Sequence, residues 1–254
     1  MKRGFIITAT KINWHLSFFL YLVIAFFGGL IKEVLIILVL LFAHELGHLF
    51  FLRLFKYPVK QIDIYPFGAI ISFDETHNDF VYKKILIASG GIIVNILLCL
   101  ILFPFKNWFT INLLLMIINL MPLFPLDGGR IFGSIMELIF PYRYARKSLF
   151  LWGFLLSFAA IIAFILYYRR IYLLLLVMIL FKLNYEKYQL LADDWIVFTT
   201  NKYLYPNKKL PIKKIKYWLK HPINALFSGK NNVYRFGECE IKEEVILKDV
   251  LENQ

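Results

Sequence analysis

Residues 41–49 read Leu-Phe-Ala-His-Glu-Leu-Gly-His-Leu and lie inside an apolar block that runs from Val34 to Leu54. A helix of this length can cross the ~30 Å hydrocarbon core of a bilayer. His44 and His48 are four residues apart, so on a helix both imidazoles point to the same side, about 6 Å apart along the axis. Two histidines and a carboxylate are costly in lipid unless they face the protein interior and serve a function. The stretch therefore predicts a membrane helix that carries a polar site.

His44, Glu45 and His48 form the pattern H-E-x-x-H, in which both histidines can bind one metal ion. Glu45 directly follows the first histidine and can reach a water molecule on that metal. The alternative is a polar cluster that only holds neighbouring helices together. A catalytic zinc site also needs a third protein ligand and one open position.

The composition extends the membrane prediction to most of the chain. Hydrophobic residues make up 60% of it and the mean hydropathy is +0.66, whereas soluble domains contain about 45–50% apolar residues. This excludes an ordinary cytosolic domain, a disordered chain and a disulfide-stapled secreted module. We expect six spans: Leu16–Leu30, Val34–Leu54, Ile85–Phe105, Trp108–Leu126, Leu149–Tyr168 and Ile171–Leu183. The sixth is short for a bilayer, so it either tilts or pairs with the fifth as a tight hairpin.

The charges predict the orientation. The chain has 29 Lys and Arg against 17 Asp and Glu, a formal net charge of +12. Such a balance can indicate nucleic-acid binding, but here the positive residues flank the apolar blocks or lie in the tail after Lys182. With a cytoplasmic N-terminus, twelve Lys and Arg before the tail fall on the cytoplasmic side, and only Lys32, Lys106, Arg169 and Arg170 fall outside. We therefore predict a multi-pass membrane protein with both ends in the cytoplasm and no nucleic-acid partner.

Two segments are not expected to span the membrane. Residues 61–65 and 69–73 are short β-prone runs on either side of Pro66, Phe67 and Gly68, which predicts a hairpin loop. The tail from Asn184 has room for one small helix-and-strand unit. The expected fold is an all-α polytopic membrane protein of about six transmembrane helices, with a β-hairpin loop and a small cytoplasmic α+β tail. The expected domains are residues 1–183 and 184–254.

Asp127 is the best candidate for a third metal ligand. It follows Pro122 and Pro125, which break a helix, and precedes two glycines that favour a sharp turn. A broken helix at membrane depth is tolerated only where it is buried in protein or lines a cavity. The spacing alone fits a solvated turn at the helix exit equally well, and the two prolines favour a carboxylate presented to a metal.

These motifs together resemble the site-2 protease family of intramembrane zinc metalloproteases. The resemblance rests on His44-Glu45-x-x-His48 and on Asn119-x-x-Pro122-x-x-Pro125-Leu126-Asp127-Gly128-Gly129. The stretch Gly91-Ile92-Ile93-Val94-Asn95 matches the family's third motif, G-x-x-x-N/S/G, although Gly91 and Asn95 could also simply allow close helix contact. Within the family, the layout is most similar to the stage IV sporulation protein FB group.

The resemblance implies a role for each matching position. His44, His48 and Asp127 would be the ligands of one zinc ion per chain, and Glu45 would activate the water. Asn119 and Asn95 would hold the substrate or the geometry of the site. The loop around Pro66, Phe67 and Gly68 would dip into the membrane and pair with an extended substrate, and Pro125 would also contact the substrate.

The resemblance further implies a function and partners. The chain would be an intramembrane zinc metalloendopeptidase that cuts a membrane-associated protein, and the sporulation group suggests a pro-sigma factor like pro-sigma-K and membrane inhibitor proteins. One alternative is a general site-2 protease that cuts anti-sigma factors or signal-peptide remnants. Another is a metal-binding membrane transporter or an inactive scaffold. The tail is similar to a reduced cystathionine-β-synthase-type unit, and whether it binds a nucleotide stays open.

Overall fold

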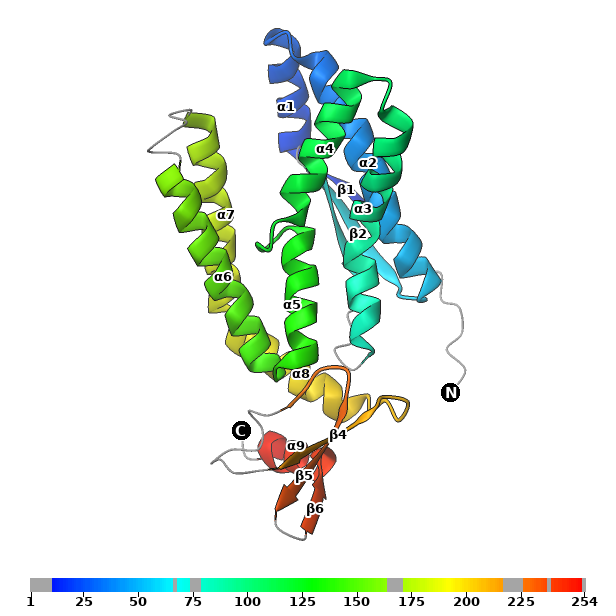
Figure 1. Cartoon of the computed structure of the whole chain (residues 1–254), viewed down its shortest axis with the longest axis vertical. Helices are drawn as coiled ribbons and strands as arrows, with labels where there is room; N and C mark the ends of the chain where they lie inside the picture. The colour runs from blue at the N-terminus through cyan, green and yellow to red at the C-terminus, as the bar shows by residue number, and fades with distance from the viewer. Residues whose placement is uncertain are drawn as a thin grey trace. The chain divides into compact units, whose positions relative to one another are not determined.

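The computed structural model describes residues 11–65, 68–73, 79–163, 171–216, 226–236 and 239–252 (Figure 1). These residues are mostly helical and also form two three-stranded sheets. The chain divides into two compact units, which are described separately. Unit 1 comprises Met1–Glu75 and Leu86–Leu120, and unit 2 comprises Thr76–Ile85 and Met121–Gln254.

Unit 1 contains the helix with the paired histidines and a small sheet. Its elements are β1 (Lys11–Trp14), α1 (Leu16–Phe27), α2 (Ile31–Leu54), β2 (Val59–Tyr65), β3 (Gly68–Phe73), the greater part of α3 (Val81–Leu102) and α4 (Lys106–Leu120). The first helix is shorter than the predicted span because it ends before Gly29, whose φ of 70° is not helical. Figure 1 shows the sheet beside α2.

The sheet of unit 1 has the order β1-β2-β3. Strands β2 and β3 pair antiparallel and correspond to the two β-prone runs of the sequence, while β1 pairs parallel with β2. The Asn13 side chain donates a hydrogen bond of 2.9 Å to Asp63 directly across that pair. The sequence analysis missed β1 because a four-residue strand carries little local signal. The entry of the hairpin into the membrane stays a prediction, and Pro66 and Phe67 lie outside the described residues.

Two helices of the described residues, α2 and α3, are long and apolar enough to cross a membrane. Both expose large apolar side chains, for example Phe42, Phe50 and Leu100, which is expected of surfaces that face lipid. The break predicted from Pro122 and Pro125 is present, since α4 ends at Leu120 and the next helix begins at Asp127. The fourth helix is therefore six residues shorter at this end than the predicted span, which ran to Leu126. The count of six spans and the cytoplasmic ends stay predictions.

The close approach of α2 and α3 depends on two glycines. A Cβ atom at Gly90 would overlap the carbonyl group of Gly47, and a Cβ atom at Gly47 would overlap the carbonyl group of Gly90. Glycine at both positions therefore lets the two backbones touch, as small residues do between membrane helices.

Unit 2 combines further apolar helices with the tail. Its elements are α5 (Asp127–Ile139), α6 (Tyr142–Ala163), α7 (Ile171–Gln189), α8 (Leu191–Leu204), β4 (Ile212–Lys216), β5 (Asn231–Phe236), β6 (Cys239–Lys242) and α9 (Glu243–Glu252), together with the start of α3. Helices α6 and α7 pack together, and Asn184 of α7 donates a hydrogen bond of 3.2 Å to the Phe150 carbonyl of α6. Helix α7 continues six residues past the predicted end of the sixth span at Leu183, and the connection to α6 lies outside the described residues.

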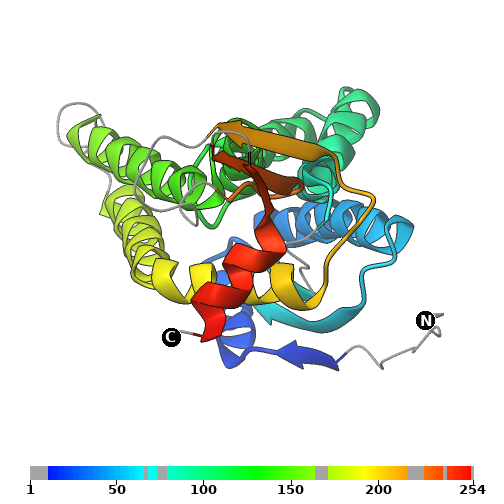
Figure 2. The ribbon, with the colours of Figure 1, turned by 90° about the horizontal axis from the view of Figure 1, so that it is seen from below.

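The tail forms a sheet of order β4-β5-β6, with a parallel and then an antiparallel pair. Helix α9 packs on β5 and β6 and also contacts α8 (Figure 2). The buried core of this region consists of Tyr142, Phe198, Leu226, Tyr234 and Leu247. Tyr142 belongs to α6, and its ring stacks on Phe198 of α8 with 4.0 Å between centroids. The core therefore joins the tail to α6, which precedes it in the chain. The predicted boundary after residue 183 stays a prediction.

Replacing Gly90 with alanine should lower the free energy of unfolding by about 1–3 kcal/mol, because the added methyl group forces α2 and α3 apart. Denaturant unfolding of the purified protein in detergent measures this change. Leu100→Ala is the matched control, since Leu100 on the same helix is 75% exposed and its truncation should change the stability by less than about 0.5 kcal/mol. Equal stability of Gly90→Ala and the wild type would contradict the close backbone contact.

Candidate metal centre

The paired histidines lie on one buried face of α2. His44 is 3% exposed and His48 is 5% exposed. Their Nε2 atoms are 3.2 Å apart, and their ring centroids are 4.9 Å apart. The helical spacing in the sequence therefore brings the two imidazoles together as predicted.

Contacts of the Nδ1 atoms orient both rings. His48 Nδ1 lies 2.7 Å from the backbone carbonyl oxygen of Ile87 on α3, and His44 Nδ1 lies 3.3 Å from Oδ1 of Asn95 on the same helix. Because these oxygens accept hydrogen bonds, the contacts favour the tautomer with the proton on Nδ1 and the lone pair on Nε2. This is the arrangement that metal-bound histidines usually adopt, with the second ring nitrogen bonded to a protein oxygen.

The distance between the two Nε2 atoms fits a shared metal ion. Zinc binds imidazole nitrogen at about 2.0–2.1 Å, and tetrahedral geometry then places two such nitrogens about 3.3 Å apart. The observed separation is 3.2 Å. The spacing of the two Nε2 atoms therefore fits a tetrahedral zinc site.

Gly91 is needed for the position of His44. A Cβ atom at Gly91 would overlap the imidazole ring of His44. Asn95 lies one turn further along α3 and contacts the same ring through its side chain. Gly91 and Asn95, the two fixed positions of the G-x-x-x-N stretch, therefore both pack against His44, a candidate metal ligand. This contact explains both residue types in addition to close helix packing.

Asn112 supports Asn95 and was missed by the sequence analysis. It is fully buried on α4 and donates a hydrogen bond of 2.8 Å to the backbone carbonyl of Asn95. An asparagine in the middle of an apolar helix was the available signal, since polar groups in such helices usually have a structural or functional role. Glu45 is partly buried on α2 next to His44.

Asp127 lies in unit 2, where it is the first residue of α5 and is 8% exposed. The turn before it is tightly packed, because a Cβ atom at Gly129 would lie 2.6 Å from the carbonyl group of Leu123. The Leu126 carbonyl accepts hydrogen bonds of 3.1 Å from the Gly129 amide and 3.3 Å from the Arg130 amide. Asp127 is therefore buried at the start of a helix, which excludes the solvated turn at a helix exit.

The structure places the other predicted site residues without testing their roles. Asn119 is partly exposed near the end of α4 in unit 1. Pro125 is exposed in the turn that precedes α5 in unit 2, and Gly68 is the first residue of β3. Contact of these residues with a substrate stays a prediction, as it does for Pro66 and Phe67 outside the described residues.

Comparison with known proteins gives consistent matches. Residues 32–110 match the model of Peptidase family M50. The chain is 25% identical over 153 residues to stage IV sporulation protein FB of Bacillus subtilis, which covers 54% of this chain and 51% of that protein. It is 26% identical over 166 residues to a zinc metalloprotease of Methanocaldococcus jannaschii, covering 57% of this chain and 48% of that protein. The chain therefore spans about half the length of the curated relatives it matches.

The solved structure of a site-2 protease from Methanocaldococcus jannaschii has a similar fold. The TM-score is 0.52 at 23% sequence identity, and the alignment covers 69% of this chain and 89% of that one. The predicted resemblance to the site-2 proteases is confirmed. The segment that matches the family model contains the H-E-x-x-H pattern and the G-x-x-x-N stretch, while Asp127 lies beyond its end.

Gly91→Ala should weaken zinc binding by about tenfold or more, because the added methyl group displaces the His44 ring from its position against α3. Competition with a chromogenic chelator on the purified protein measures the zinc dissociation constant. Ile93→Ala, a larger change in side-chain volume two residues away at a partly exposed position, should leave the constant unchanged. Unchanged zinc affinity in Gly91→Ala would show that the ring does not need this contact.

Proposed function

We propose that this chain, a relative of the site-2 proteases whose residues 32–110 match Peptidase family M50, is an intramembrane zinc metalloendopeptidase. The observation that carries the proposal is the 3.2 Å separation of two buried imidazole Nε2 atoms on a membrane-length apolar helix. Buried imidazoles with this spacing and these tautomers have little use in a helix contact, for which neutral amide or hydroxyl side chains suffice.

The proposed zinc ligands are His44, His48 and Asp127. Each offers one ligand atom and each is buried. Two histidines with one carboxylate are a ligand set found in zinc hydrolases, and three protein ligands leave one position open for water or substrate. The proposal includes one zinc ion per chain.

The chemistry requires a base beside the metal as well as the metal itself. A zinc ion at this site would supply Lewis-acid activation of water and of the scissile carbonyl group. Glu45 accepts a proton from the attacking water and returns it to the nitrogen of the leaving amine. Glu45 is only partly buried on α2, so water can reach it, whereas the neighbouring His44 is buried.

The proposed substrate is a membrane-associated protein. The 25% identity to stage IV sporulation protein FB supports a role in sporulation and a pro-sigma factor similar to pro-sigma-K as the target. The same proposal includes about six membrane spans, both ends of the chain in the cytoplasm and a domain boundary after residue 183. It also includes membrane proteins that inhibit the enzyme. If no pro-sigma factor is cut, the alternative substrates are anti-sigma factors or signal-peptide remnants.

Glu45→Gln should reduce cleavage at least about 100-fold, because the amide cannot accept the proton of the attacking water. Co-expression with candidate pro-sigma factors and immunoblotting for the shortened product measures the cleavage. Metal analysis of the purified variant should still find about one zinc per chain, since Glu45 is not a ligand. A variant that cleaves as well as the wild type would exclude Glu45 as the base. A wild type that binds zinc but cleaves no candidate would leave the metal-binding transporter or scaffold.

Asp127→Asn should weaken zinc binding by about tenfold or more, because a neutral amide replaces a charged ligand. Chelator competition in detergent gives the dissociation constant, and the same preparation is assayed for cleavage. Asp193→Asn removes a carboxylate from an exposed position on α8 and should change neither value. If Asp127→Asn binds zinc as tightly as the wild type, Asp127 is not a ligand, whether or not the variant still cleaves the substrate.

A further inference from the structure

Helix α5 carries a second buried carboxylate that the proposed chemistry does not use. Glu137 lies ten residues after Asp127 and is 1% exposed. Its Oε2 lies 3.0 Å from Nζ of Lys84, in the first turn of α3, and its Oε1 lies 3.4 Å from Nε of Arg146 on α6. One carboxylate therefore connects three helices of unit 2 through two ion pairs.

The segment 226–230, which we call the tail loop, packs against this cluster. Lys84 also donates a hydrogen bond of 3.2 Å to Oγ of Ser228, which is fully buried. The Leu226 carbonyl accepts a hydrogen bond of 2.9 Å from the Tyr142 amide at the start of α6. Lys230 donates one of 3.1 Å to the Leu138 carbonyl, next to Glu137. Three members of the tail loop thus hold the start of α3, the end of α5 and the start of α6.

Gly229 lets the tail loop approach α3 closely. Its φ of 63° lies in the left-handed region, where a side chain is strained. A Cβ atom there would lie 2.7 Å from Cγ2 of Val81 and 3.1 Å from the Asp79 carbonyl oxygen. The loop is therefore shaped to fit against the first turn of α3.

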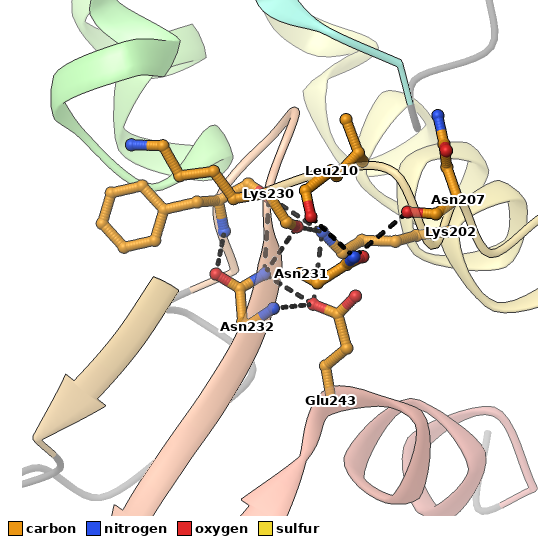
Figure 3. Close-up of polar contacts among 8 residues, drawn as sticks. Lys202, Asn207, Leu210, Lys230, Asn231, Asn232 and Glu243 are labelled. Atoms are coloured by element: carbon orange, nitrogen blue, oxygen red, sulfur yellow. Dashed lines mark hydrogen bonds and ion pairs between the residues drawn. The ribbon is translucent and has the colours of Figure 1, made fainter. Parts of the chain in front are cut away.

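The other side of the tail loop is held by the tail itself (Figure 3). Lys202 of α8 donates hydrogen bonds of 2.9 Å to the Phe227 carbonyl and 2.6 Å to the Lys230 carbonyl, and it pairs with Glu243 at 3.2 Å. Asn232 donates a hydrogen bond of 2.6 Å to Glu243. Burial lowers the pKa of the Lys202 ammonium group, and the Glu243 carboxylate opposes this shift. The loop is thus fixed from both sides by buried polar groups.

We propose that Glu137 is a positioning residue that, together with the tail loop, fixes the far end of α5 and so holds Asp127 in place for the metal. The inference rests on the proposed ligand role of Asp127. A 13-residue helix is rigid over its length of about 20 Å. Its end at Glu137 is bound to Lys84 and Arg146. The tail loop therefore supports the helix that carries Asp127.

A double-mutant cycle on the ion pair tests this inference. Glu137→Gln and Lys84→Met each remove one charge, and each should raise the zinc dissociation constant about tenfold and lower kcat with little change in KM. The double variant should lose no more than either single variant, because both act on one interaction. Glu240→Gln, which breaks the exposed Lys214–Glu240 pair of the same tail, is the matched control and should match the wild type. A merely structural role would lower thermal stability and leave the zinc affinity and kcat of the folded protein unchanged.

Hydrogen exchange on the metal-free protein separates this inference from the proposed function. In Glu137→Gln and in Ser228→Ala, amides 130–139 of α5 should exchange at least about tenfold faster than in the wild type and in Glu240→Gln. Ser228→Ala removes only one hydroxyl group, so this variant still tests the inference if Glu137→Gln and Lys84→Met do not fold. Unchanged exchange of α5 in the variants that fold overturns the inference, even if the wild type binds zinc and cleaves. Failure of the wild type to bind zinc would instead overturn the proposed function.

Discussion

The orientation of two imidazoles inside an apolar helix is the constraint on which the rest of this structure depends. The Nε2 atoms of His44 and His48 lie 3.2 Å apart, a separation that suits one shared metal ion. The protein holds both rings in this arrangement through contacts of Nδ1 with the Ile87 carbonyl and the Asn95 side chain. Those acceptors stand on α3, so the site requires α3 to lie directly against α2. An apolar environment strengthens these contacts, since water does not compete for them.

The absence of side chains at three glycines is what permits that approach. Gly47 and Gly90 bring the backbones of α2 and α3 into contact, and Gly91 leaves room for the His44 ring. Apolar side chains contribute little to helix association in lipid, so close backbone packing and polar contacts have to supply it. The Asn112–Asn95 hydrogen bond adds such a contact from α4. Packing and metal binding therefore depend on the same few positions.

In unit 2, contacts at both ends hold the short helix α5 in place. Helix α5 begins after a turn that packs closely against Gly129, and near its end it carries a buried carboxylate with two basic partners. A buried carboxylate without partners would be strongly unfavourable, so Glu137 requires Lys84 and Arg146 to stay in place. The stacked rings of Tyr142 and Phe198 extend the same core into the tail. The tail thus shares buried polar and aromatic contacts with the helices it follows.

The sequence by itself determined the features that depend on local geometry. The four-residue spacing of His44 and His48 requires a shared helix face, the prolines before Asp127 require a break, and the β-prone runs around Gly68 match paired strands. Only the tertiary structure decided what meets these elements. The Asn13–Asp63, His48–Ile87 and Glu137–Lys84 contacts join residues that are 50, 39 and 53 positions apart, and the acceptor for His48 is a backbone carbonyl. A backbone carbonyl is identical in every residue, and contacts across such distances follow from packing, so no local pattern encodes them.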